Sequence, residues 1–103
     1  MKWDSSDQRD YRVVAVDEWR FLGIYPTLKA RAGVYIFADA KLQVKYIGKA
    51  GAGRMVKEVA DAIRRDKAYH ATRIKALYTN SEANARSLEA ALIDNYNPPN
   101  NRT

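Results

Sequence analysis

Glu89 is the carboxylate of this sequence whose position most needs a chemical explanation. It falls in a predicted helix with Ala85, Leu92 and Tyr96, which lie four before, three after and seven after it and share its face. Burying a carboxylate on an apolar face is costly unless it is paired or binds a metal. Two interpretations stay open: a metal ligand, or a side chain at the edge of the stripe that reaches water or a lysine.

Two tyrosines form the second candidate group. Tyr35 and Tyr46 lie on two strand-like runs that can pair as a hairpin, which would bring their phenols together on one face. Tyrosine also suits strands generally, so core packing is an alternative. Gly33 and Gly48 stand at the outer ends of the hairpin, where a missing side chain lets a ligand or helix approach the backbone. Ordinary use in turns explains these glycines equally well.

Positive charge is concentrated in the middle of the chain. The net charge is +6, and between Lys45 and Lys75 nine basic residues face three acidic ones, so this stretch carries 9 − 3 = +6 and the rest is neutral. A localised basic segment favours a polyanionic partner, because each Lys or Arg on a phosphate releases counterions. Solvated helices are often basic too, so charge alone does not decide for nucleic acid.

Composition excludes several kinds of site. The absence of cysteine rules out disulfides, thiolate zinc sites and cysteine nucleophiles, and His70 as the only histidine rules out a multi-histidine metal site. No apolar run approaches the roughly 20 residues that cross a bilayer, and the N-terminus does not resemble a signal peptide. We therefore expect an intracellular protein without membrane contact, whose metal, if any, is bound by oxygen or imidazole.

The elements that must position these residues follow from periodicity. We predict strands at 34–37, 44–47 and 73–78, a helix at 54–65, and a helix at about 82–96 that Asn80 or Ser81 caps and Asn97-Pro98-Pro99 ends. Arg54 would sit at the start of the first helix, off its apolar stripe. The order β-β-α-β-α predicts an α+β fold, a small antiparallel three-stranded sheet flanked by helices.

The N-terminal third is predicted to be an accessory segment, residues 1–32, packed on a module of residues 33–103. Within it, Tyr11–Val16 reads as a short strand by its β-branched content, and Trp19–Leu22 as either a helical turn or an extended segment. Pro26 argues against a long regular element.

Five pieces in order resemble the GIY-YIG nuclease superfamily. They are Gly33-Val34-Tyr35, Tyr46-Ile47-Gly48-Lys49, a following arginine, Leu88-Glu89-Ala90 and the stretch from Tyr96 to Asn101. The resemblance covers residues 33–101 and is closest to the nuclease domain of bacterial excision-repair incision subunits. A literal Gly23-Ile24-Tyr25 also occurs, but it lies too far from Tyr46 for a tight hairpin and precedes a proline, so it is rejected.

The resemblance implies a GIY-YIG fold and metal-dependent cleavage of DNA. Glu89 would hold one Mg²⁺ or Mn²⁺ that binds the scissile phosphate. Arg54 would offset charge on the phosphoryl oxygens. Tyr35 would act as general base or water positioner, with Tyr46 and Lys49 placing the phosphate and nearby positive charge lowering the pKa of the phenol.

Further residues are expected to support the site or to contact DNA. Gly33, Gly48 and Asn101 would support the site, Asn101 as the late asparagine of the family. The expected DNA contacts are Lys45, Lys49, Arg64, Arg65, Lys67, His70 and Arg73. His70 would match a histidine that some homing-type relatives carry.

Two departures from the family pattern bear on these expectations. The spacing from Gly48 to Arg54 is about two residues shorter than is usual in the repair branch, and Glu58 stands where an aromatic residue or histidine is common. Arg54 is preferred over Arg64 and Arg65 because it begins the helix.

Two rival functions follow. A catalytically inactive DNA-binding module of the same fold would bind DNA without cutting it, and an interaction domain would present its basic face to an acidic protein. A chain this short also suggests either a structure-selective or nonspecific nuclease, or a catalytic module that a partner protein directs to its target.

Overall fold

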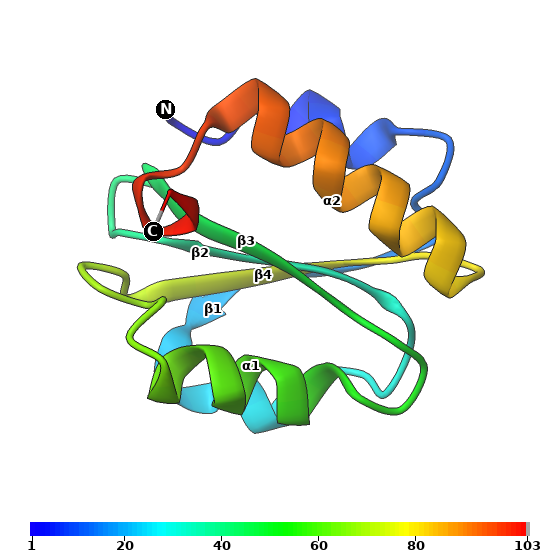
Figure 1. The fold of residues 1–103 in the computed structure, drawn as a ribbon, viewed down its shortest axis with the longest axis horizontal. Coiled ribbons are helices and arrows are strands. Elements are labelled where there is room, and N and C mark those ends of the chain that lie inside the picture. Colours follow the sequence, from blue (N-terminus) through cyan, green and yellow to red (C-terminus); the bar gives the residue numbers. More distant parts are fainter. Residues whose placement is uncertain (103) are drawn as a thin grey trace.

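A four-stranded antiparallel sheet forms the middle layer of the computed structural model, which describes residues 1–102. The strands are β1 (Ala15–Phe21), β2 (Gly33–Ala38), β3 (Val44–Ala50) and β4 (Arg73–Tyr78), in the spatial order β1-β4-β2-β3. Helix α1 (Met55–Arg64) covers one face and α2 (Glu82–Tyr96) the other (Figure 1). The predicted α+β fold is confirmed, with four strands in place of three.

The fourth strand comes from the N-terminal segment. β1 pairs with β4, with Ala15 opposite Tyr78 and Phe21 opposite Arg73. The predicted strand at Tyr11–Val16 was therefore wrong in its bounds: the strand begins at Ala15 and includes Trp19, leaving Leu22 to open a short 3-10 helix, η2 (Leu22–Thr27). Pro26 lies inside η2, which a kink at Ile24 divides into two short turns, so no long regular element runs through it.

The two helices begin and end as their local sequences require. Ser81 accepts a hydrogen bond from the Asn84 N–H and so caps α2, whereas Asn97 ends it in the left-handed conformation before two prolines. Helix α1 ends in a Schellman motif: Asp66 is left-handed, its N–H bonds to the Ile63 carbonyl, and the Lys67 N–H bonds to the Ala62 carbonyl. Both predicted helices are confirmed to within one residue at each end.

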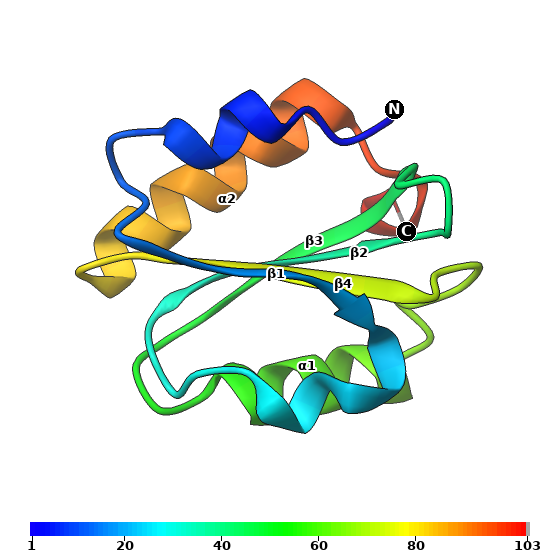
Figure 2. The same ribbon diagram turned by 180° about the vertical axis from the view of Figure 1, so that it is seen from behind.

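Each face of the sheet carries its own core. On the α1 side, β2 contributes Tyr35 and Phe37, which pack with Met55 and Val59 of α1. On the other side, Leu88 and Leu92 of α2 pack on the sheet together with Trp3, whose ring stacks on Tyr96 at 5.3 Å. The short 3-10 helix η1 (Ser5–Arg9) and the chain before it lie beside α2, as the reverse view shows (Figure 2). In residues 1–102, no helix is both long and apolar enough for a membrane span.

The two edges of the sheet are formed by strands from different parts of the chain. β1 forms one edge, and β3 forms the other. The 3-10 helix η3 (Pro99–Asn101) lies against β3, so the C-terminal part of the chain returns to the strand that carries Tyr46 and Lys49. The β3 edge is therefore where both helices, the hairpin and the C-terminal segment can contribute side chains to one site.

Candidate active site at the β3 edge

A polar cavity lies between the end of β3 and the starts of α1 and α2. Its volume is about 290 Å³. Lys49 from β3 and Arg54 at the start of α1 both line it, so the structure brings these two predicted site residues together. The other lining residues are Ala50, Gly51, Glu58, Glu82, Ala85 and Arg86.

Arg54 occupies the N-cap position of α1, off the buried stripe, as predicted. Its side chain is 55% exposed and forms an ion pair with Glu58 at 3.1 Å, one turn along the helix. Exposed pairs of this kind contribute about 0.3–0.5 kcal/mol. A phosphate could therefore replace Glu58 as the partner of Arg54 at small cost.

Glu89 lies on α2 one turn beyond the lining residue Ala85. Ala85, Leu92 and Tyr96 are buried as the stripe predicts, whereas Glu89 is half-buried at the edge of the stripe. Burial raises the pKa of Glu89 above its ordinary value, and the positive charge of Lys49 opposes this rise. Within residues 1–102 the Glu89 carboxylate has no ion pair within 4 Å, and Lys49 does not fully offset the effect of burial on its pKa.

A divalent cation fits this carboxylate. Among the described residues there is no cluster of three acidic or histidine side chains that could enclose a metal. Mg²⁺ keeps several waters and commonly binds through one or two carboxylates together with substrate phosphates. Glu89 therefore suits a cation whose other ligands are water and phosphate oxygens.

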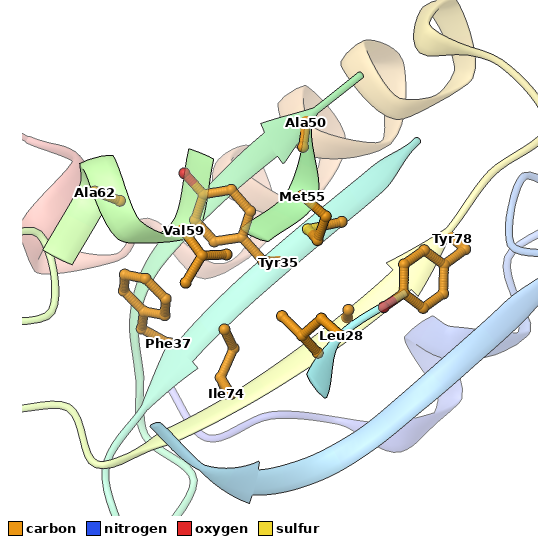
Figure 3. Close-up of a cluster of buried hydrophobic side chains, with 10 residues drawn as sticks. Leu28, Tyr35, Phe37, Ala50, Met55, Val59, Ala62, Ile74 and Tyr78 are labelled. Atoms are coloured by element: carbon orange, nitrogen blue, oxygen red, sulfur yellow. The ribbon is translucent and has the colours of Figure 1, made fainter. Parts of the chain in front are cut away.

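Tyr35 and Tyr46 belong to an aromatic cluster on the α1 side of the hairpin. Because Phe37 pairs with Tyr46 and Gly48 pairs with Tyr35, the two tyrosines are diagonal neighbours, with ring centroids 6.2 Å apart. Figure 3 shows the rings of Tyr35 and Phe37 on the face of the sheet that Val59 and Met55 also occupy. The predicted proximity of the two phenols is confirmed, and core packing applies as well, since Tyr35 is only 2% exposed.

The expected lowering of the Tyr35 pKa is wrong. Burial raises the pKa of the Tyr35 phenol well above its ordinary value, and Tyr46, Glu58 and Glu89 raise it further. Arg65 is the group that opposes the rise. The hydroxyl therefore stays protonated at neutral pH, and it lies within electrostatic reach of both carboxylates of the site.

Gly48 is required by the position of that hydroxyl. A Cβ atom on Gly48 would stand 2.3 Å from the Tyr35 hydroxyl oxygen, well inside any real contact. Gly33 is constrained differently, because its Cβ would stand 2.3 Å from the Leu77 backbone carbonyl on β4. One glycine therefore makes room for a candidate catalytic side chain, and the other for strand packing.

Asn101 holds the strand that carries these residues. Its amide Nδ2 donates to the Ile47 carbonyl and its Oδ1 accepts from the Ile47 N–H, both at 2.9 Å. The side chain thus pairs with the open edge of β3 as another strand would. Ile47 lies between Tyr46 and Gly48, so Asn101 fixes the backbone at the centre of the site.

The expected DNA-contacting residues come from several elements: β3, the end of α1, the loop after it and β4. Lys67 lies near the site, with Nζ 6.0 Å from the centre of the Tyr46 ring, and Arg65 acts on Tyr35. Arg73 lies two strands away from β3, and its guanidinium stacks on Phe21 at 4.3 Å. The structure does not bring Arg73 to the site.

The remaining basic candidates are engaged locally or exposed. Arg64 is paired with Asp61, and Lys45 lies 3.9 Å from Asp39. His70 is exposed in the left-handed conformation on the loop after α1. Lys75, which contributed to the charge of the basic segment, is buried and paired with Glu18, so it is not available to a polyanion.

Three residues near the site were missed from the sequence. Glu82 and Arg86 line the cavity because α2 begins beside Gly51, whose missing side chain leaves room for the Glu82 carboxylate. Asn100 donates to the carbonyls of Lys67 and Tyr69, both at 2.9 Å. No local pattern marks these residues, because their neighbours are distant in the sequence.

Known proteins share this arrangement. A family model described as the UvrC-like GIY-YIG domain matches residues 31–102. UvrABC system protein C of Novosphingobium aromaticivorans is 38% identical over 82 residues, which cover 73% of this chain and 12% of that protein. The chain thus spans about an eighth of that relative's length.

A solved structure agrees with the sequence comparisons. It is the GIY-YIG N-terminal endonuclease domain of UvrC from Thermotoga maritima, bound to its catalytic divalent cation, magnesium. The TM-score is 0.61 at 26% identity, and the match covers 72% of this chain and 86% of that domain. Family model, relative and fold agree, so this chain belongs to the UvrC-like GIY-YIG family of nuclease domains.

Proposed function

We propose that this chain is a divalent-metal-dependent DNA endonuclease whose site lies at the β3 edge. The observation that carries the proposal is the half-buried Glu89 carboxylate, which has no ion pair in residues 1–102 and lies beside Lys49. The similarity to a magnesium-bound UvrC endonuclease domain supports it. The net positive charge supports a polyanionic substrate.

Each side chain has a role in hydrolysis of a phosphodiester. Glu89 would hold one Mg²⁺ or Mn²⁺, which when bound supplies Lewis-acid stabilisation of phosphate charge. Arg54 exchanges Glu58 for a non-bridging phosphate oxygen and stabilises the charge that builds there in the transition state. Lys49 lines the same cavity as Arg54 and is close enough to Glu89 to act on its pKa, so it would bind the same phosphate group from the β3 side.

Tyr35 acts as a water-orienting group rather than as an ionised base. Because burial keeps its hydroxyl protonated, Tyr35 can donate one hydrogen bond and accept another. An attacking water could donate to this hydroxyl and present its lone pair to phosphorus. The new P–O bond would replace the bond from phosphorus to the leaving sugar oxygen, which would take up a proton from solvent, while the attacking water would lose its proton to solvent. Tyr46 lies at the diagonal position on the same face and would place the phosphate together with Lys49.

Cleavage of plasmid, single-stranded and branched DNA with Mg²⁺, Mn²⁺ or a chelator tests the proposal. We expect metal-dependent cutting that falls more than about 100-fold in Glu89→Gln, because the variant keeps the shape of the side chain but loses its charge. Asp94→Asn on the exposed face of α2 is the matched control and should cut normally. Cutting that survives in Glu89→Gln would show that another group holds the metal.

A non-cutting DNA-binding module is the alternative that one observation favours. Arg54 is already paired with Glu58, and the segment from Gly48 to Arg54 is short, so the guanidinium could be held away from the phosphate. This alternative would be established if the wild type and Glu89→Gln both bound DNA in a salt-sensitive manner but neither cut it with any metal. Glu58→Gln should then restore cutting if the ion pair is the cause.

We also propose that targeting comes from outside these 103 residues. The relative from Novosphingobium aromaticivorans is named as a component of the UvrABC system, and this chain corresponds to 12% of it. Further domains or a partner protein would supply the choice of DNA site. This chain would then cut poorly and without sequence preference when assayed by itself.

A further inference from the structure

The loop between α1 and β4, residues 65–72, presents an aromatic side chain to solvent. Tyr69 is 56% exposed, and its ring centroid lies 4.0 Å from that of His70. A single exposed aromatic residue is common on protein surfaces and needs no explanation. Tyr69 is different because it borders a cavity.

That cavity has a volume of about 360 Å³ and lies beyond the C-terminal end of α1, whereas the first cavity lies at the start of that helix. Its size is in the range of ligand-binding pockets, about 300–1,000 Å³. Its lining combines two cations, a carboxylate, an amide and an aromatic ring: Arg65, Lys67, Asp66, Asn100 and Tyr69.

The loop is held in place before any ligand arrives. Asn100 donates to two of its carbonyls, those of Lys67 and Tyr69, and so ties the loop to η3. The Schellman motif at Asp66 and Lys67 fixes its first residues, and the Ala71 N–H bonds to the Ala68 carbonyl. A ring on a fixed loop loses little conformational entropy when something stacks on it.

A chain of contacts joins this cavity to the candidate active site. The lining residue Lys67 lies 6.0 Å from the centre of the Tyr46 ring, which in turn lies 6.2 Å from the ring of Tyr35. Arg65, also in the lining, is close enough for its charge to act on the Tyr35 hydroxyl. A strand whose phosphate lies at Tyr35 would therefore carry an adjacent nucleotide toward Tyr69.

The charges indicate which part of a nucleotide belongs in the cavity. Asp66 would repel a phosphate there, but its carboxylate can accept a hydrogen bond from the amino group of a base. Arg65 and Lys67 can contact the flanking phosphates. A base that is paired and stacked in a duplex cannot reach the Tyr69 ring, whereas an unpaired base can.

We propose that the α1–β4 loop is a subsite for an unpaired base next to the scissile phosphate, which stacks on Tyr69. The substrate class is then DNA with unpaired nucleotides beside the cut, such as a gap, flap or single strand. This inference rests on the proposed nuclease function of the same site. It gives Tyr69 a role in binding DNA and gives the site a preference for unpaired nucleotides.

The test measures binding in EDTA, so that no cutting occurs. Two oligonucleotide substrates carry 2-aminopurine at the same position, unpaired in a gap in one and fully paired in the other. We expect Tyr69→Leu to weaken binding of gapped DNA by about 5- to 100-fold, the effect of losing one base–aromatic stack, and to abolish the quenching of 2-aminopurine. Tyr69→Phe should bind and quench as the wild type does, because the ring is retained.

Tyr11→Leu is the matched control, since Tyr11 is 86% exposed on the turn after η1, and it should not change binding. Equal affinity of Tyr69→Leu and wild type for gapped DNA would overturn the inference, as would an equal loss on gapped and fully paired DNA. Absence of any DNA binding by the wild type would overturn it too. Failure of the nuclease proposal is separate: it would appear as absence of metal-dependent cleavage.

Discussion

The half-buried carboxylate of Glu89 lowers the stability of the folded protein when it is ionised. It stands on a helix whose neighbouring face is buried, and burial raises its pKa, so its ionised form is disfavoured in the folded protein. Because the pKa of Glu89 is higher in the folded than in the unfolded protein, its protonated form favours folding. This contribution to stability is complete below the pKa of the unfolded state and is lost as pH rises through the higher pKa of the folded state. At neutral pH the charged carboxylate therefore opposes folding unless a cation offsets it.

Replacement of Glu89 by glutamine should raise thermal stability in chelator. The difference in Tm between Glu89→Gln and wild type is expected to be small near pH 4 and to grow toward pH 8, because ionisation of the half-buried Glu89 destabilises the wild type as pH rises. Differential scanning fluorimetry across this range measures it. The control is Asp94→Asn, at an exposed position of α2, whose Tm difference from wild type should not grow with pH. A Tm of Glu89→Gln below that of wild type at pH 8 would contradict this expectation.

Added Mg²⁺ should stabilise the wild type and not Glu89→Gln. A cation at tenfold excess over its Kd stabilises the folded state by about 1.4 kcal/mol. For a domain of this size that energy raises Tm by several degrees, at about 4–8 °C per kcal/mol. An equal rise in the two proteins would mean that the cation binds elsewhere.

Gly48→Ala should damage the site through Tyr35. The added Cβ would lie 2.3 Å from the Tyr35 hydroxyl, so the ring must move, at a cost of about 1–3 kcal/mol. Cleavage should fall with it. Tyr35→Ala empties part of the core and should by itself cost about 3–5 kcal/mol, but in that background Gly48→Ala should cost little more, because the clash is gone. A double-mutant cycle in urea would measure this coupling, and cleavage should not return in the double variant. Gly23→Ala, which meets no atom within 4 Å, is the control.

At the scale of elements, the edge strand β3 depends on its partners. β2 supplies backbone hydrogen bonds on one side only, and on the other side the Asn101 amide pairs with both backbone groups of Ile47. Unpaired backbone groups on an edge strand open more easily to solvent. The C-terminal segment therefore stabilises the strand that carries Tyr46 and Lys49.

Asn101→Ala should loosen this strand. Loss of two hydrogen bonds to a partly buried backbone is expected to cost about 1–3 kcal/mol. The Ile47 amide hydrogen should exchange much faster, whereas amides of β4 should change only as global stability changes. Asn95→Ala on the exposed face of α2 is the control, and unchanged exchange at Ile47 would show that η3 holds β3 by other contacts.

At the scale of the whole molecule, the N-terminal segment is fastened by a buried carboxylate. Asp17 on β1 is 7% exposed; it accepts a hydrogen bond from the Tyr78 hydroxyl at 2.6 Å and pairs with Lys29 at 2.7 Å. Burial would raise the pKa of Asp17, but the hydrogen bonds from Lys29 and Tyr78 outweigh it and the pKa is lowered. This network joins β1, the chain before β2, and β4.

Asp17→Asn should destabilise the whole domain. The charge of Asp17 contributes stability that is complete above its unfolded pKa near 4 and is lost as pH falls through the lower folded pKa. We expect a loss of about 1–3 kcal/mol at pH 7 and a smaller loss near pH 3. Urea unfolding at both pH values measures this, and an equal loss at both would mean that packing rather than charge is responsible.

The division of the chain into an accessory segment, residues 1–32, and a module, residues 33–103, stays a proposal. The family model begins at residue 31, which supports it. β1 nevertheless belongs to the same sheet as β4, and Trp3 packs in the core beside α2. A fragment that lacks β1 would expose the outer edge of β4, so we propose that the two parts fold as one unit.

The sequence by itself determined the parts of this protein that depend on local pattern. Periodicity placed both helices and the hairpin. The ordered motifs selected Tyr35, Lys49, Arg54 and Glu89 as the proposed site residues, because these residues lie in the elements whose spacing marks the family. Capping by Ser81 and termination at Asn97 were also readable, since each involves neighbours within four residues.

Only the tertiary structure decided the features that depend on distant neighbours. β1 begins at Ala15 because its register is set by pairing with Tyr78, 63 positions away in the chain, and β-branched content could not show this. The raised pKa of Tyr35, the stacking of Arg73 on Phe21, the burial of Lys75 beside Glu18 and the cavity beside Tyr69 have the same origin. Burial and electrostatic environment are set by which segments pack together, and non-local packing leaves no periodic trace in the sequence.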